Sequence, residues 1–144
     1  MITLENYKSF FDNAKNISDV IYKAHSFDDD FIDYFADDLD WYNLSTYEPL
    51  SYFIIKKHQD KICWLELIRF SNLSNDLMIE FDKHMNWDMV IRYQTPSYDL
   101  ISKHLNEINW DVFLHQGRRL PEDFLNQNIA FFKKILAEEH FYVL

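Results

Sequence analysis

Residues 73–94 read LSNDLMIEFDKHMNWDMVIRYQ, and residues 96–114 repeat the same pattern as PSYDLISKHLNEINWDVFL. The four tryptophans of the chain follow this repetition at a constant spacing of 23 residues: Trp41, Trp64, Trp87 and Trp110. Self-similarity at a fixed period of about 20–50 residues is the sequence signature of a repeat protein. The sequence therefore predicts an array of 23-residue units, each built around one tryptophan.

Each unit opens with a residue that suits the N-cap of a helix. This position holds Asp28, Ser51, Ser74 and Ser97. Three and four residues later each unit has an apolar pair: Phe31-Ile32, Ile54-Ile55, Leu77-Met78 and Leu100-Ile101. Apolar residues at steps of three and four form one stripe along a helix. The first part of each unit therefore predicts a short helix with one buried face.

A second cap column stands directly before the tryptophan in three of the four units, with Asp40, Asn86 and Asn109, and the remaining unit has Cys63 at this position. From the tryptophan onward a second apolar column follows: Leu44, Leu67, Val90 and Phe113. Each unit is thus predicted to be two short antiparallel helices, neither of which can bury its apolar face alone. Because stacked units bury a continuous core, the predicted fold is all-α, an α-solenoid of stacked short antiparallel helical hairpins with degenerate N- and C-terminal caps.

The predicted organisation is a single helical-repeat domain over residues 1–144. Its parts are an N-terminal cap (1–26), four repeats (27–49, 50–72, 73–95 and 96–118) and a C-terminal partial repeat and cap (119–144). Near Gly117, the single glycine, one inserted residue shifts the repeat register. Residues 129–140 predict a longer closing helix, and the apolar residues 141–144 are expected to cover the last unit's core.

Composition and charge exclude several classes of protein. One glycine leaves no Gly-rich phosphate loop, and one cysteine cannot form an internal disulfide or a multi-thiolate zinc site. No basic segment followed by an apolar stretch opens the chain, and apolar runs fall far short of the ~20 residues that cross a bilayer. A cytoplasmic location follows as the prediction. The net charge of −10 disfavours binding to nucleic acid or anionic membranes.

The repeat motif resembles a known kind of array. Short helical repeats in uncharacterised reading frames of large DNA viruses and phages carry Leu-Ser-x-x-Phe/Leu-Ile, then Ile-Asn-Trp-x-x-Ile, and close on Tyr-Gln. The matching residues here are Leu73-Ser74, Leu77-Met78, Asn86-Trp87, Ile91 and Tyr93-Gln94, and the resemblance covers about residues 27–126. It implies a helical repeat protein of viral or phage origin, which would act in the host cytoplasm.

Candidate chemistry is sparse. Cys63 with His58 would form a thiol–imidazole pair, but Cys63 occupies a helix-cap column. His58 and His104 share a column with Phe35 and Phe81, so they are expected to face the core as structural histidines. Two repeats separate these histidines by on the order of 20 Å, too far to share a metal ion. The sequence therefore predicts no enzyme, no cofactor and no metal site.

Two surfaces are candidates for binding a partner. The first is a polar and aromatic row near the ends of the second helices, which combines Arg with Tyr as protein interfaces do. Its members are Thr46, Tyr47, Arg69, Phe70, Arg92, Tyr93 and His115, extended by Arg118 and Arg119. The alternative is an acidic site on the first repeat: Asp28, Asp29, Asp30, Asp33, Asp37 and Asp38. Residues 27–49 have a net charge of −8, most of the chain's total.

The predicted function is a non-enzymatic protein-binding repeat module, a viral or phage protein that engages a host factor. The alternative is an acidic nucleic-acid mimic that inhibits a host defence or DNA-handling protein through its acidic first repeat. The expected partner is a protein, with no direct nucleic-acid binding and no membrane binding. An exposed end of the stack is a possible site of homo-oligomer formation.

Overall fold

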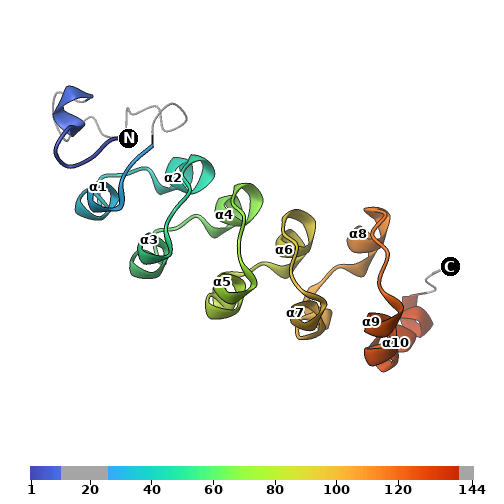
Figure 1. Ribbon diagram of the computed structural model, residues 1–144. Coiled ribbons are helices and arrows are strands. Elements are labelled where there is room, and N and C mark those ends of the chain that lie inside the picture. The colour runs from blue at the N-terminus through green and yellow to red at the C-terminus, as the bar shows by residue number, and fades with distance from the viewer. Residues whose placement is uncertain (11–25, 140–144) are drawn as a thin grey trace. The chain divides into compact units, whose positions relative to one another are not determined.

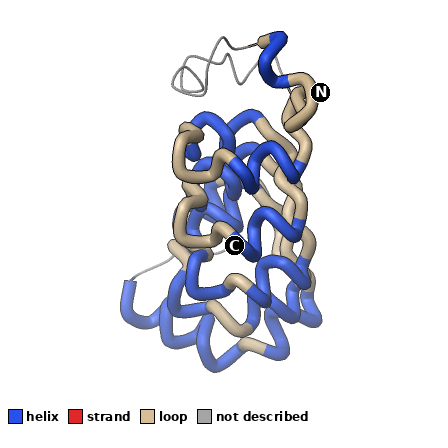
Figure 2. The backbone as a smooth tube through the Cα atoms, turned by 90° about the vertical axis from the view of Figure 1, so that its left-hand side faces the viewer, coloured by secondary structure: helices blue, strands red, loops and turns tan. Residues whose placement is uncertain are grey.

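The computed structural model describes residues 1–10 and 26–139, and in these ranges the protein is all-α. Figure 2 shows helix and loop in the described residues, and the one β-type feature there is a single bridge between Ile2 and Phe27. Ten short α-helices follow in order: α1 (Asp29–Tyr34), α2 (Trp41–Tyr47), α3 (Tyr52–Lys57), α4 (Trp64–Phe70), α5 (Asn75–Glu80), α6 (Trp87–Tyr93), α7 (Tyr98–Ser102), α8 (Trp110–His115), α9 (Glu122–Gln127) and α10 (Ile129–Glu139). The predicted all-α class is confirmed, and α2, α4, α6 and α8 each begin at a tryptophan.

The chain forms two compact units, Met1–Asn72 and Leu73–Leu144. In the first unit α1 packs against α3 and α2 against α4, so that two layers of helices enclose the core (Figure 1). In the second unit α5 and α7 lie on one side and α6 and α8 on the other, and α9 packs against α10 (Figure 1). The boundary between the units falls where the sequence places the boundary between the second and third repeats.

The seven predicted helix caps are confirmed. The side-chain oxygens of Asp28, Ser51, Ser74 and Ser97 accept the backbone N–H three residues later, at 2.8–3.3 Å. Those of Asp40, Asn86 and Asn109 do the same for α2, α6 and α8, at 3.1–3.3 Å. Cys63 also has N-cap geometry at α4, but its side chain makes no capping hydrogen bond. The fold thus tolerates one uncapped helix among its Trp-led helices.

Replacing Cys63 by Asn is expected to raise the free energy of unfolding by about 1 kcal/mol, because Asn supplies the missing cap acceptor. The two asparagines at the equivalent positions, Asn86 and Asn109, already make this hydrogen bond. Urea denaturation followed by circular dichroism measures the gain. Cys63→Ala serves as the control that removes the thiol without adding an acceptor, and equal stability of the two variants would contradict the assignment of a vacant cap.

The apolar columns of the sequence form the core. Phe31, Ile32, Ile54, Leu44, Leu67 and Val90 are at most 1% exposed. Among the tryptophans, Trp87 and Trp110 are 2% and 5% exposed, whereas Trp41 and Trp64 are partly buried. Each indole N–H is bonded to the residue five positions earlier: to the backbone carbonyls of Ala36, Gln59 and Leu105, and to the Asp82 carboxylate from Trp87. The tryptophan therefore fixes the loop between the two helices of its own repeat.

The ends of the array depart from the repeat. Gly117 lies two residues beyond the end of α8 with φ 71°, the left-handed conformation that ends helices and favours glycine. Beyond it, α9 begins after Pro121, which supplies no side-chain cap, and the closing helix α10 ends at Glu139.

The predicted N-terminal cap is described over residues 1–10. Its remaining residues up to 25 and the predicted cover over 141–144 lie outside the described residues.

The N-terminal segment is attached to the first repeat through its backbone. The Ile2 N–H donates to the Ser26 carbonyl at 2.7 Å, and the Asp28 N–H donates to the Ile2 carbonyl at 3.0 Å. Ile2 is 1% exposed and packs in one cluster with Phe27, Phe31 and Phe35. None of the described helices is both long enough and apolar enough to span a membrane.

Candidate functional site

In the first unit, the predicted partner-binding row lies at the ends of α2 and α4. Tyr47 and Phe70 are the last residues of these helices and are 48% and 54% exposed. The Arg69 guanidinium lies over the Phe70 ring, 5.1 Å from its centroid. Thr46 is half-buried, and its hydroxyl donates to the Tyr42 carbonyl at 2.8 Å. Because α2 packs against α4, the structure brings these residues to one pair of neighbouring helices.

In the second unit, only some members of the same row are exposed to solvent. Arg92 is exposed and Tyr93, the last residue of α6, is 39% exposed. His115 is exposed, and its Nδ1 lies 2.6 Å from the Asp111 carbonyl oxygen of its own helix. Arg118 is half-buried and donates to the Ile91 carbonyl at 2.7 Å, so its guanidinium is bound to α6. Arg119 is exposed.

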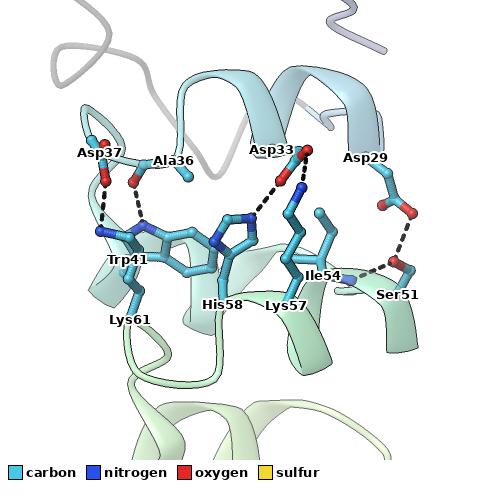
Figure 3. Close-up of polar contacts among 10 residues, drawn as sticks. All are labelled: Asp29, Asp33, Ala36, Asp37, Trp41, Ser51, Ile54, Lys57, His58 and Lys61. Carbon is cyan, nitrogen blue, oxygen red and sulfur yellow. Dashed lines mark hydrogen bonds and ion pairs between the residues drawn. The ribbon is translucent and has the colours of Figure 1, made fainter.

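The acidic site is largely engaged in contacts within the first unit (Figure 3). Asp28 caps α1, and Asp29 accepts the Ser51 hydroxyl at 2.6 Å. Asp33 accepts from Lys57 and lies 2.7 Å from Nε2 of His58. The carboxylates at 29, 33 and 37 form a stripe with a spacing of four, which places them along one side of the first repeat. That side faces Ser51, Lys57, His58 and Lys61 of the next repeat (Figure 3).

These ion pairs lower the pKa values of two of the carboxyl groups. Hydrogen bonds from Lys57 and His58 hold the pKa of the Asp33 carboxyl below its ordinary value. The Lys61 ammonium, 2.8 Å away, does the same to the pKa of the 88% exposed Asp37. Asp30 and Asp38 are exposed as well. Two-thirds of the predicted acidic site therefore holds the first repeat together or joins it to the second.

The two core-column histidines fill structural positions against tryptophans. His58 lies between Asp33 and Trp41, with its ring centroid 5.4 Å from the indole. His104 stacks on Trp87 at 3.7 Å with an interplanar angle of 11°, and its nitrogens lie 3.3 Å from Asp82 and 2.9 Å from Glu107. Within residues 1–10 and 26–139, no group of three or more His, Cys, Asp or Glu side chains is arranged to hold a metal ion.

Cys63 occupies the N-cap position of α4. It is half-buried, and its backbone N–H donates at 3.1 Å to the hydroxyl of Ser45, which is fully buried.

An open hollow of about 390 Å³ lies at the start of α8, lined in part by Asp88, Glu107 and Asp111. Asp88 accepts the Asn109 N–H and Glu107 contacts His104, so two of these three carboxylates already serve the fold.

The structure adds two features that sequence reasoning missed. One is a pair of lysine–aromatic contacts on α3, in which Lys56 lies over the Tyr52 ring and Lys57 over the Phe53 ring. The other is a buried polar position shared by Glu48 and Gln94, which are 6% and 4% exposed. Their side-chain oxygens accept the N–H groups of Phe27 and Leu73 at 3.1 and 2.9 Å, in each case 21 residues earlier. The sequence signal for this second feature was the repeat register, because Glu48 and Gln94 occupy the same position of the repeat, two repeats apart.

Comparison of the chain with protein-family models, with curated proteins and with solved structures finds no match.

Proposed function

We propose that the protein is a non-enzymatic, protein-binding repeat module whose hairpins continue as an α-solenoid, and that it is a viral or phage protein engaging a host factor in the cytoplasm. One observation carries the proposal: three of the four Trp-led helices end in an exposed aromatic residue, namely Tyr47, Phe70 and Tyr93. These side chains are 39–54% exposed, and aromatic residues are enriched at protein interfaces because they supply a large apolar area. The resemblance of the repeat motif to viral and phage arrays supports the proposed source.

The composition of this row supports a protein as the partner. In two of the three repeats the exposed aromatic follows an exposed arginine: Arg69-Phe70 and Arg92-Tyr93. Tyr, Trp and Arg are the residues that most often dominate the energy of protein interfaces, because they combine a large apolar area with a polar or charged end. We propose one binding row at Thr46, Tyr47, Arg69 and Phe70 in the first unit, and a separate row at Arg92, Tyr93, His115 and Arg119 in the second.

The acidic decoy is the second proposal, and one observation favours it. Residues 27–49 have a net charge of −8, and the carboxylates of Asp30, Asp37 and Asp38 are exposed. A cluster of exposed carboxylates attracts a basic cleft over a distance of about one Debye length, ~10 Å at 0.1 M salt. Because Asp28, Asp29 and Asp33 are engaged within the fold and the exposed Asp37 is paired with Lys61, only Asp30 and Asp38 of the six predicted residues are exposed without such an assigned contact.

Affinity capture from a host lysate with two matched variants tests both proposals. Arg69→Glu combined with Arg92→Glu is expected to lower recovery of the partner at least tenfold, since loss of an interface hot spot costs about 2 kcal/mol or more. Asp30→Asn with Asp38→Asn changes exposed acidic residues and is expected to leave recovery unchanged. The reverse pattern would support the decoy, and unchanged recovery with both variants would refute both surfaces. Circular dichroism verifies that each variant is folded.

A further inference from the structure

His104 lies where the third and fourth repeats meet, between two carboxylates and a tryptophan. It stands two residues beyond the end of α7, and its ring stacks almost parallel on the Trp87 indole, with 3.7 Å between the centroids and an interplanar angle of 11°. Its Nδ1 lies 2.9 Å from a carboxylate oxygen of Glu107, and its Nε2 lies 3.3 Å from one of Asp82. The side chain of His104 is 10% exposed, so these three neighbours enclose most of the ring.

The charged groups around this ring are known for the described part of the chain. Within residues 1–10 and 26–139, the carboxylates of Asp82 and Glu107 are the charged groups that contact it. Lys83 and Lys103 adjoin Asp82 and His104 in the sequence, and both are exposed. The Asp82 oxygen that faces His104 also accepts the Trp87 indole N–H at 3.1 Å. The indole, the imidazole and Asp82 therefore form one connected cluster, to which Glu107 adds a second negative charge.

The two carboxylates suit the protonated form of the ring. A neutral imidazole has one N–H and one nitrogen that is only an acceptor, whereas the imidazolium ion has an N–H on both nitrogens. In the neutral ring, one nitrogen of His104 would therefore turn its lone pair toward a carboxylate oxygen 2.9 or 3.3 Å away. Protonation removes this repulsion. It also places a cation on the face of the Trp87 indole, where the ring electrons attract positive charge.

The equivalent histidine of the first unit does not make the same demand. His58 has one carboxylate contact, with Asp33 at 2.7 Å from its Nε2, which a neutral ring can satisfy with its single N–H (Figure 3). The same carboxylate also accepts from Lys57 at 2.7 Å, so its charge is already paired. The His58 ring lies 5.4 Å from Trp41 at an interplanar angle of 39°, a looser contact than the stack on Trp87. The chain thus contains its own comparison for His104.

We propose that His104 is a pH-sensitive switch in the contact between the third and fourth repeats. When the ring takes up a proton, Glu107 and Asp82 hold the cation against Trp87 and the two repeats are joined more firmly. Histidine ordinarily changes its charge between pH 5 and 8, so the switch acts in the mildly acidic range. Because the folded contact stabilises the charged ring, its contribution to stability is present at low pH and is lost as the pH rises. The proposal does not depend on either partner surface proposed above.

The first test compares the unaltered protein with His104→Phe in urea denaturation at pH 5.5, 6.5 and 7.5. Phenylalanine is the matched substitution, because Phe35 and Phe81 occupy this position in the first and third repeats. We expect the ratio of the two unfolding constants, variant to unaltered protein, to grow at least about fivefold from pH 7.5 to 5.5, as one cation–π contact with an added ion pair allows. Comparison at each pH cancels the contribution of Glu48, which both proteins contain.

His58→Phe is the control for this test. It makes the same chemical change at the same repeat position, where one carboxylate contacts the ring. Its ratio is expected to change less than about twofold over the same pH range, within the usual small value of one exposed ion pair. An equal pH dependence of His58→Phe and His104→Phe would overturn the proposal, because any histidine at this position would then have the effect.

The second test measures the charge of the ring by ¹⁵N NMR. The two nitrogens of an imidazolium ion resonate close together, whereas those of a neutral imidazole lie far apart. We expect the imidazolium pattern for His104 at pH 5.5. At pH 6.5 we expect a smaller imidazolium fraction in Glu107→Gln than in the unaltered protein, because the variant keeps the ring and its packing but removes one negative charge.

Three further results would overturn the proposal: a constant ratio of unfolding constants for His104→Phe at all three pH values, a neutral pattern for His104 at pH 5.5, or an unchanged imidazolium fraction in Glu107→Gln. Circular dichroism verifies that each variant is folded. If His104→Phe does not fold, Glu107→Gln replaces it in the denaturation series, with the same sign of pH dependence expected. These variants leave Arg69 and Arg92 intact, so failure of this proposal does not refute the partner rows proposed above.

Discussion

Replacing Trp87 by Ala is expected to lower the free energy of unfolding by about 3–5 kcal/mol, the usual result of removing a large aromatic side chain from a core. The indole is 2% exposed, stacks on His104 at 3.7 Å and donates to Asp82 at 3.1 Å. The substitution therefore removes buried area and ring stacking, and it deletes the donor to a carboxylate. Urea denaturation followed by tryptophan fluorescence and circular dichroism measures the loss.

Two controls separate packing from hydrogen bonding at this position. Trp87→Phe keeps a ring against His104 but has no N–H, so its loss is expected to be smaller than that of the alanine variant. Tyr93→Ala removes an exposed aromatic from the same helix and is expected to change stability by less than about 1 kcal/mol. A loss of under 1 kcal/mol for Trp87→Ala would show that the tryptophan does not organise its repeat.

Exchanging the residues at the buried polar position is expected to shift stability in opposite directions. Gln94→Glu places a carboxylate where the glutamine is 4% exposed, which is expected to lower the free energy of unfolding at pH 7 by about 2 kcal/mol. Glu48→Gln removes a buried charge and keeps an oxygen that accepts the Phe27 N–H, so a gain of about 1 kcal/mol is expected. Each substitution introduces the residue that the other repeat has at the same position in the unaltered protein.

The shifted pKa of Glu48 determines the direction in which the stability of the protein changes with pH. Burial raises the pKa of the Glu48 carboxyl above its ordinary value, and the hydrogen bond from the Phe27 N–H opposes this only in part. The folded state therefore holds the proton at pH values where the unfolded state has released it. Glu48 therefore contributes stability that is fully present below the pKa of its carboxyl in the unfolded chain. This stability is lost as the pH rises through the raised pKa of the same carboxyl in the folded protein.

Denaturation series between pH 4 and 8 measure this dependence. The difference in stability between Glu48→Gln and the unaltered protein is expected to be smallest at the acid end of the series and to grow toward pH 8. Gln94→Glu is expected to introduce a second slope of the same sign. A constant difference at all pH values would mean that Glu48 is not titrating in a buried site.

The 23-residue period predicted much of the local structure from the sequence. Helix caps depend on a side chain and the backbone three residues later, so a single pattern such as Ser-x-x-Leu is enough to identify Ser74 as a cap. The starts of α2, α4, α6 and α8 at tryptophan followed from the same reasoning. The apolar columns were predictable because a helix places residues three and four apart on one face.

The candidate site was harder to predict because its members depend on neighbouring repeats. The row ending in Tyr47 and Phe70 was predictable as exposed, since it follows the last buried residue of each Trp-led helix. Arg118 was not predictable, because its bond to the Ile91 carbonyl crosses 27 residues of sequence. The acidic residues read as a free surface in the sequence, whereas Asp33 and Asp37 pair with lysines that lie 24 residues later.

The sequence by itself determined the repeat length, the helical class and the residues that begin each helix, because these depend on interactions within one turn or between adjacent turns of a helix. The tertiary structure alone decided how much of each tryptophan is buried, which carboxylates are engaged, and that Glu48 and Gln94 are enclosed. The Asp33–Lys57 pair and the Arg118 bond join neighbouring repeats at separations of 24 and 27 residues, whereas the bonds to Glu48 and Gln94 join the two ends of one repeat at 21 residues. Such contacts depend on how the helices are placed in space, which the pattern along a single helix does not specify.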